Sequence, residues 1–195
     1  MIPPDRIAGR WDLDTGVIEG CPPVTRRLSQ VRDSFADQKA CDAILLHDDP
    51  VIYTVSTFDL ASGPGELHYG LGALYPGRVG DEFFLTRGHF HARREASEIY
   101  LGLRGSGVMI LQGEDGRATT AHLVPNGFVY VPPRTAHRTV NTGSEKLVYL
   151  GVYPADAGHE YGSVDFQLVV IARDGAPLIL PRGDFVPRAS SDRTP

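Results

Sequence analysis

From Pro50 onward, the chain is a series of short apolar runs separated by turns rich in Gly, Pro and Asp. Runs of this length between such turns are typical of β-strands, and many of them in succession are typical of a sandwich or barrel. The sequence therefore predicts an all-β fold with a few short helices. The expected strands are residues 51–55, 72–75, 82–85, 99–103, 107–112, 118–123, 128–131 and 147–153.

The two ends of the chain are less regular than this central series. Residues 11–18 predict a hairpin with its turn at 14–16, and residues 37–46 predict a short helix capped by Asp37. A last hairpin is expected at 169–180 around an Asp-Gly turn. We expect one domain over residues 1–187, made of an N-terminal extension (1–49) and a barrel (about 50–165), and then a disordered tail at 188–195.

Composition excludes several classes of function. The net charge of -5 argues against a nucleic-acid or anionic membrane partner. No apolar run approaches the ~20 residues that span a bilayer, and the N-terminus has no apolar stretch of a secretory signal, so we expect a cytoplasmic protein. Two isolated cysteines, Cys21 and Cys41, suggest neither a disulfide framework nor a cysteine-based zinc site.

Four residues from three segments have the side chains of a metal site. His89 and His91 are separated by one residue, so both imidazoles lie on one face if the segment is extended. Glu98 begins a second alternating run, and His137 follows a Pro-Pro turn far downstream. Three imidazoles and one carboxylate predict a site for a divalent transition metal.

The residues around these ligands resemble the two sequence motifs of the cupin superfamily. Gly-His-x-His-x6-Glu-x6-Gly spans residues 88–105, and Gly-x4-Pro-Pro-x3-His-x3-Asn spans residues 127–141. The six-residue spacer before Glu98 is longer than in most cupins. The resemblance implies a double-stranded β-helix, a jelly-roll barrel that often holds one metal ion inside.

A finer resemblance is to the cupin-type glucose-6-phosphate isomerases. It rests on residues 75–91, 131–141 and 153–162, with further similarity at 12–20 and 27–29, and it covers roughly residues 10–165. This resemblance implies an enzyme that interconverts glucose 6-phosphate and fructose 6-phosphate with one divalent metal per subunit. It also implies a homodimer, which the N-terminal strands could form by exchange at a sheet edge.

Aldose–ketose isomerisation needs a base near C1 and C2, an electrophile on the sugar oxygens, and a grip on the phosphate. The metal would polarise O1 or O2, and Glu98 beside it is the expected proton carrier. Cation binding lowers the basicity of Glu98, and a hydride shift between the carbons is the alternative. Tyr100 faces the same side as Glu98 and would orient it or a substrate hydroxyl. His159, in the family segment, would help to open the ring or shuttle a proton.

Holding the phosphate requires hydrogen-bond donors more than bulk charge. The resemblance implies that these donors are Tyr53, Thr86, the backbone N–H of Gly88, Tyr153 and Tyr161. Gly72 departs from the resemblance, because relatives often carry a threonine there that helps to hold the sugar phosphate. We expect another hydroxyl or a water to serve instead. Tyr149 and Tyr153 share one face of an expected strand, so either can also simply fill the barrel.

The four expected metal ligands limit both the choice of metal ion and the choice of reaction. Four protein ligands leave two open positions on a six-coordinate Fe²⁺ or Mn²⁺ and none on a tetrahedral Zn²⁺, so Fe²⁺ is expected first, with Mn²⁺, Ni²⁺ and Zn²⁺ as alternatives. The same ligands suit an iron-dependent cupin dioxygenase, although tyrosine and threonine donors argue against an oxygenase pocket. The remaining alternatives are an isomerase of another phosphosugar, such as mannose 6-phosphate, and a non-catalytic sugar-binding cupin.

Overall fold

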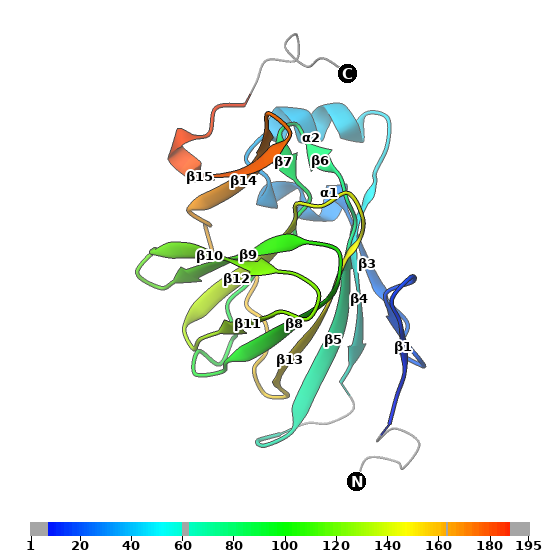
Figure 1. Cartoon of the computed structure of the whole chain (residues 1–195). Coiled ribbons are helices and arrows are strands. Elements are labelled where there is room, and N and C mark those ends of the chain that lie inside the picture. Colours follow the sequence, from blue (N-terminus) through cyan, green and yellow to red (C-terminus); the bar gives the residue numbers. More distant parts are fainter. Residues whose placement is uncertain (1–7, 60–62, 163, 188–195) are drawn as a thin grey trace.

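The structure, a computed structural model, describes residues 8–59, 63–162 and 164–187, and its architecture is a barrel of two facing antiparallel sheets (Figure 1). The expected all-β barrel with a few short helices is confirmed. The larger sheet has the order β11-β8-β13-β5-β4-β3 and contains β3 (Val24–Arg27), β4 (Val51–Phe58), β5 (Leu67–Leu74), β8 (Glu98–Arg104), β11 (Phe128–Val131) and β13 (Leu147–Pro154). The smaller sheet has the order β10-β9-β12 and contains β9 (Gly107–Gly113), β10 (Ala118–Leu123) and β12 (Thr135–Asn141). The expected disordered tail lies outside the described residues.

Apolar side chains from both sheets fill the space between them. Side chains alternate between the inside and the outside of the barrel along each strand. In β11, for example, Val129 and Val131 are buried while Phe128 and Tyr130 are exposed. The same cluster includes Leu28, Phe35, Ile52, Leu74, Met109, Ile110, Leu123, Val140 and Leu147. Period-two alternation thus directs one face of each strand into the barrel, which is also where the polar side chains of a site must lie.

A layer of short elements closes one end of the barrel (Figure 1). It contains α1 (Leu28–Val31), α2 (Gln38–Leu45), 3₁₀ turns at Arg32–Ser34 and Arg182–Asp184, and a sheet of β6 (Arg78–Val79), β7 (Glu82–Phe83), β14 (Leu168–Arg173) and β15 (Ala176–Pro181). The expected cap is confirmed, since Asp37 accepts a hydrogen bond from the N–H of Ala40 (2.9 Å). In the described part of the chain, no helix is long and apolar enough to cross a membrane.

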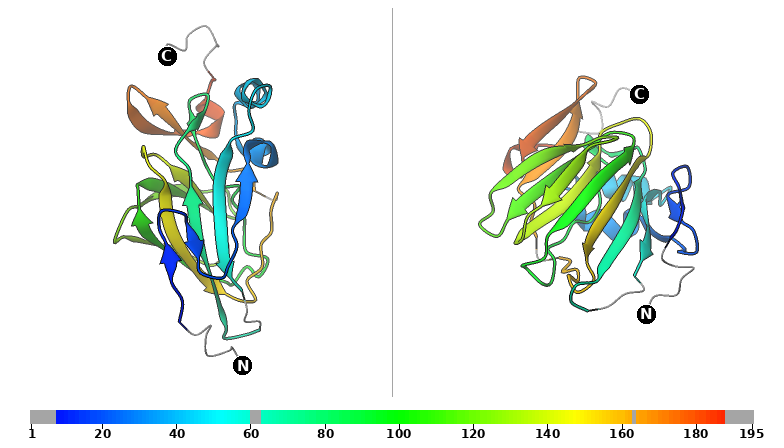
Figure 2. Two further views of the ribbon diagram at one scale, coloured as in Figure 1. Left: turned by 90° about the vertical axis from the view of Figure 1, so that its right-hand side faces the viewer. Right: turned by 60° about the horizontal axis from the view of Figure 1, so that its bottom comes forward.

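Both expected hairpins are present. β1 (Trp11–Asp12) pairs with β2 (Val17–Ile18), and this hairpin lies on the outer face of the larger sheet, where Ile18 packs with Phe58 and Leu71 (Figure 2). The β14–β15 hairpin turns at Asp174 and Gly175, whose φ values are 52° and 80°. Two successive positive φ values are what a type I′ turn requires.

Glu82 joins two parts of the end layer, β7 and α2. Its carboxylate, which is 1% exposed, accepts hydrogen bonds from the N–H groups of Ala36 and Asp37, each at 2.8 Å. One side chain of β7 therefore satisfies two backbone donors at the start of α2. Burial raises the pKa of Glu82 despite these contacts.

Replacement of Glu82 by Ala should lower the free energy of unfolding by about 3 kcal/mol, because it leaves two backbone donors without their acceptor. Guanidinium unfolding at pH 7 measures this loss. The exposed Glu66→Ala is the matched control and should change stability by less than about 0.5 kcal/mol. A loss from Glu82→Ala no larger than that of the control would show that water replaces the carboxylate.

Candidate active site

The segment that carries His89 and His91 runs antiparallel to β12. The N–H of His89 donates to the carbonyl oxygen of His137 (3.2 Å), and the N–H of His137 donates back to that of His89 (3.1 Å). Glu98 begins β8 in the facing sheet. One potential ligand atom from each of these four residues lies within 4.8 Å of the other three. The structure thus gathers the four expected metal ligands into one cluster.

The imidazoles are oriented for a cation. His91 Nδ1 lies 3.2 Å from the carbonyl oxygen of Ala96, and His137 Nδ1 lies 3.4 Å from that of Thr135. A ring nitrogen that faces a carbonyl oxygen must donate, which leaves the Nε2 lone pair toward the cluster. The Nε2 atom of His89 is buried without a hydrogen-bond partner, and that of His137 faces a carboxylate oxygen of Glu98 at 3.0 Å. Buried orphaned acceptors are costly, and a divalent cation bound by the cluster would satisfy them.

Glu98 completes this cluster as an ionised group. Its Oε2 lies 3.1 Å from His91 Nε2 and 3.0 Å from His137 Nε2. Burial alone would raise the pKa of Glu98, but the contacts with the imidazoles lower it to about 2. On the other side, the hydroxyl of Tyr100 donates to the carboxylate, and burial raises the pKa of this phenol. Gly151 leaves room for the carboxylate, since a Cβ at position 151 would lie only 2.6 Å from Glu98 Oε1.

A cavity of about 240 Å³ opens beside the cluster. Every expected site residue except His91 lines it, namely Tyr53, Thr86, Gly88, His89, Glu98, Tyr100, His137, Tyr153, His159 and Tyr161. The ring of His159 stacks on that of Tyr161 (centroids 5.8 Å apart, 7° between planes) and lies 4.5 Å from that of His89. Desolvation lowers the pKa of His159, so its imidazole is neutral at pH 7.

Hydroxyl groups gather in the same cavity. Tyr53 accepts a hydrogen bond from the N–H of Arg87, and Thr86 Oγ1 accepts one from the N–H of Thr139 (3.0 Å). Burial raises the pKa of Tyr53, so its phenol remains a donor. Gly88 lies beside them with a φ of 73°, and a Cβ there would lie 2.6 Å from a neighbouring aromatic ring. Only glycine fits this position.

Arg26, Thr139 and Tyr149 also line the cavity but are not among the expected site residues. Thr139 lies two residues after His137 on β12, so strand alternation was the available signal. Tyr149 shares a face of β13 with Tyr153, and the sequence cannot separate a cavity tyrosine from one that fills the barrel. For Arg26, in the edge strand β3, the sequence carries no comparable signal.

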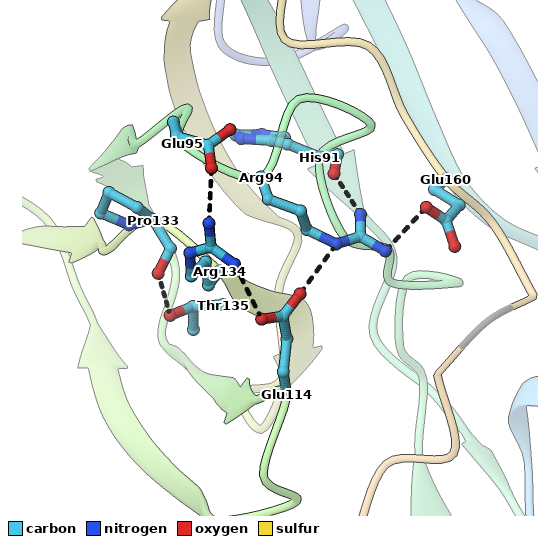
Figure 3. A network of polar contacts seen from close by, with 8 residues as sticks. All are labelled: His91, Arg94, Glu95, Glu114, Pro133, Arg134, Thr135 and Glu160. Atoms are coloured by element: carbon cyan, nitrogen blue, oxygen red, sulfur yellow. Dashed lines mark hydrogen bonds and ion pairs between the residues drawn. The ribbon is translucent and has the colours of Figure 1, made fainter.

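Arg94 fixes the six-residue loop that follows His91 (Figure 3). Its guanidinium donates to the carbonyl oxygen of His91, to Glu114 (3.2 Å) and to Glu160 (2.7 Å). The N–H of Arg134 donates to the carbonyl oxygen of Arg94 (2.7 Å). Glu114 belongs to the β9–β10 turn, and Glu160 follows β13. The loop is therefore attached to two separate parts of the barrel, which holds the backbone of His91 in place.

The family model described as glucose-6-phosphate isomerase matches residues 25–175. The chain belongs to this family. Proteins named glucose-6-phosphate isomerase from Thermococcus kodakarensis and Thermococcus gammatolerans are 48% and 47% identical to it, over 84% and 87% of this chain and 88% and 90% of their own. Membership makes the chain an enzyme of the isomerase class. A solved deletion mutant of Bacillus subtilis oxalate decarboxylase matches with a TM-score of 0.44 and 23% identity, over 55% of this chain and 27% of its own.

Replacement of Arg94 by Ala should weaken metal binding at the cluster about tenfold, because outer contacts that orient a ligand contribute 10–100-fold to metal affinity. Titration of chelator-treated protein with Mn²⁺, followed by electron paramagnetic resonance of the free ion, measures the dissociation constant. Arg117→Ala is the control, because Arg117 is 91% exposed and pairs with Asp115 in the β9–β10 turn. Equal dissociation constants for the two variants would contradict a role of Arg94 in holding His91.

Proposed function

We propose that this protein interconverts glucose 6-phosphate and fructose 6-phosphate as a metal-dependent aldose–ketose isomerase. The observation that carries the proposal is one cavity lined both by His89, Glu98 and His137 of the ligand cluster and by phosphate-suited hydroxyls. The first set suits chemistry at C1 and C2, and the second suits the distal phosphate. A dioxygenase or a plain sugar-binding protein needs only one of these sets.

The cluster His89, His91, Glu98 and His137 would hold the cation, and its nitrogen and oxygen donors suit Fe²⁺ first and Mn²⁺ as well. A divalent cation there supplies Lewis-acid polarisation of the substrate carbonyl. The Nε2 atom of His89, buried without a hydrogen-bond partner, and those of His91 and His137, which face the carboxylate of Glu98, support this assignment.

Glu98 carries the proton in this mechanism. Its low pKa keeps the carboxylate ionised, so it can take the proton from C2 of the open-chain aldose and return it to C1. A second proton passes between O2 and O1 to complete the exchange of carbonyl and hydroxyl. The O–H of Tyr100, which donates to Glu98, holds the carboxylate in one orientation.

His159 opens the sugar ring. A neutral imidazole has one donor and one acceptor nitrogen, so it can take the proton of the anomeric hydroxyl while the ring oxygen is protonated. Stacking on Tyr161 and the proximity of Tyr153 (ring centroids 5.4 Å apart) fix the plane of the imidazole. The tyrosines thus position His159 as well as the substrate.

We further propose that the active form is a homodimer that needs no nucleic-acid or membrane partner. β3 is an edge of the larger sheet, and its Val24 is 53% exposed and lines the cavity with Arg26. An edge strand presents unpaired backbone groups that a second copy can cover. Light scattering should give about twice the chain mass of 21.2 kDa, and the mass of one chain would refute the dimer.

The direct test is conversion of fructose 6-phosphate by chelator-stripped protein before and after addition of Fe²⁺, Mn²⁺, Ni²⁺ or Zn²⁺. Stripped protein should be inactive, and Fe²⁺ or Mn²⁺ should restore turnover. His137→Ala should not recover at the same metal concentration, because it lacks one ligand. Faster conversion of mannose 6-phosphate would reassign the substrate. Oxygen uptake without isomerisation would favour a dioxygenase instead.

Replacement of Glu98 by Gln should lower kcat by about 10³, because positioned proton transfer contributes about 10²–10⁴ to rate. Glu95→Gln is the control, since Glu95 is exposed and pairs with Arg134 (2.6 Å) outside the cavity. Measured metal content must be equal in the variants compared. Near-normal turnover of Glu98→Gln would exclude this residue as the proton carrier and favour a hydride shift.

A further inference from the structure

Gly72 of β5 and Tyr149 of β13 lie directly opposite each other in the larger sheet, and both line the cavity. A Cβ on Gly72 would lie 2.5 Å from the ring carbon Cε2 of Tyr149 and 2.7 Å from its hydroxyl oxygen. Both distances are far below van der Waals contact. The phenol of Tyr149 therefore occupies the space that any side chain at position 72 would take.

The hydroxyl of Tyr149 is arranged as a donor. Burial has the largest effect on its pKa and raises it, so the phenol stays protonated at physiological pH. Thr139, which lines the same cavity, acts in the opposite direction through a side-chain hydrogen bond with this phenol. A phenol can accept one hydrogen bond and donate another, so Tyr149 can accept from Thr139 and donate its own proton to an acceptor in the cavity.

Two other hydroxyls of the cavity follow the same pattern. Tyr53 accepts from the N–H of Arg87, and Thr86 accepts from the N–H of Thr139, so each retains an O–H to donate. Tyr53, Thr86 and Tyr149 all line the same cavity. Three neutral donors that each accept from the protein suit the oxygens of a phosphate group.

We propose that Tyr149 is a further phosphate-binding residue, whose hydroxyl stands in the cavity where a side chain at position 72 would otherwise lie. This inference rests on the proposed phosphosugar substrate. It also assigns a role to Gly72, since a side chain at this position would collide with the phenol. Tyr149 is therefore part of the binding site as well as of the barrel filling.

The test compares Tyr149→Phe with the parent protein and with Tyr130→Phe. The change in Tyr149 removes one oxygen and keeps the ring, whereas Tyr130 lies on the outside of β11 and is 53% exposed. Tyr149→Phe should raise KM for fructose 6-phosphate and the inhibition constant of inorganic phosphate by the same factor, about tenfold, which is about 1.4 kcal/mol. Tyr130→Phe should change neither.

A second pair of variants separates the hydroxyl from the packing of the ring. Tyr149→Val should weaken phosphate binding as Tyr149→Phe does. Adding Gly72→Ser to Tyr149→Val places a hydroxyl on β5 in the space that the phenol leaves, and should recover at least threefold of the lost phosphate affinity. A structural role of Tyr149 alone predicts lower melting temperatures without this recovery, and that result would overturn the proposal.

Calorimetric titration with inorganic phosphate separates this inference from the proposed function. In one outcome, the parent protein binds phosphate, Tyr149→Phe binds it tenfold more weakly, and neither protein has isomerase activity. The assignment of Tyr149 then stands and the proposed reaction falls. If isomerase activity is present and Tyr149→Phe leaves both constants within twofold, the assignment falls and the reaction stands. Absence of phosphate binding by the parent protein would also overturn the assignment.

Discussion

The reciprocal backbone hydrogen bonds between His89 and His137 determine the geometry of the whole site. They attach an extended segment to β12, and period-two alternation then directs His91 toward the same side as His89. The same pairing continues at Thr86 and Thr139, where the N–H of Thr86 donates to the carbonyl oxygen of Thr139 (2.9 Å). The three histidines of the metal cluster and the two threonines of the cavity therefore lie along one strand pairing.

This pairing contains an irregularity that explains Gly88. From Thr86 to His89 the segment advances three residues, while β12 advances two from Thr139 to His137. The segment therefore has one residue more than its partner, as in a β-bulge, and Gly88 with its φ of 73° absorbs it. A bulge beside a site re-aims the backbone, and this is a physical reason for a glycine between the phosphate-suited threonine and the first histidine.

The strand series, both hairpins, the cap of α2 and the ligand cluster were predictable, because each depends on local spacing or alternation. Other features were not. α1 has four residues, too few to show a helical period. β5 begins at Leu67, five residues before the expected strand, because small and polar residues interrupt its apolar pattern. The contacts of Arg94 and the packing of Tyr149 over Gly72 join residues far apart in sequence, which no local pattern records.

The four ligands come from both walls of the barrel. Glu98 lies in the larger sheet, whereas His137 and the segment paired with it belong to the smaller one. A cation bound between them is a cross-link that the sheets must release before they can separate. Thermodynamic linkage then adds about 2.7 kcal/mol to the folded state when the free ion is at a hundred times its dissociation constant. Metal supply would thus control the stability of the fold as well as the chemistry inside it.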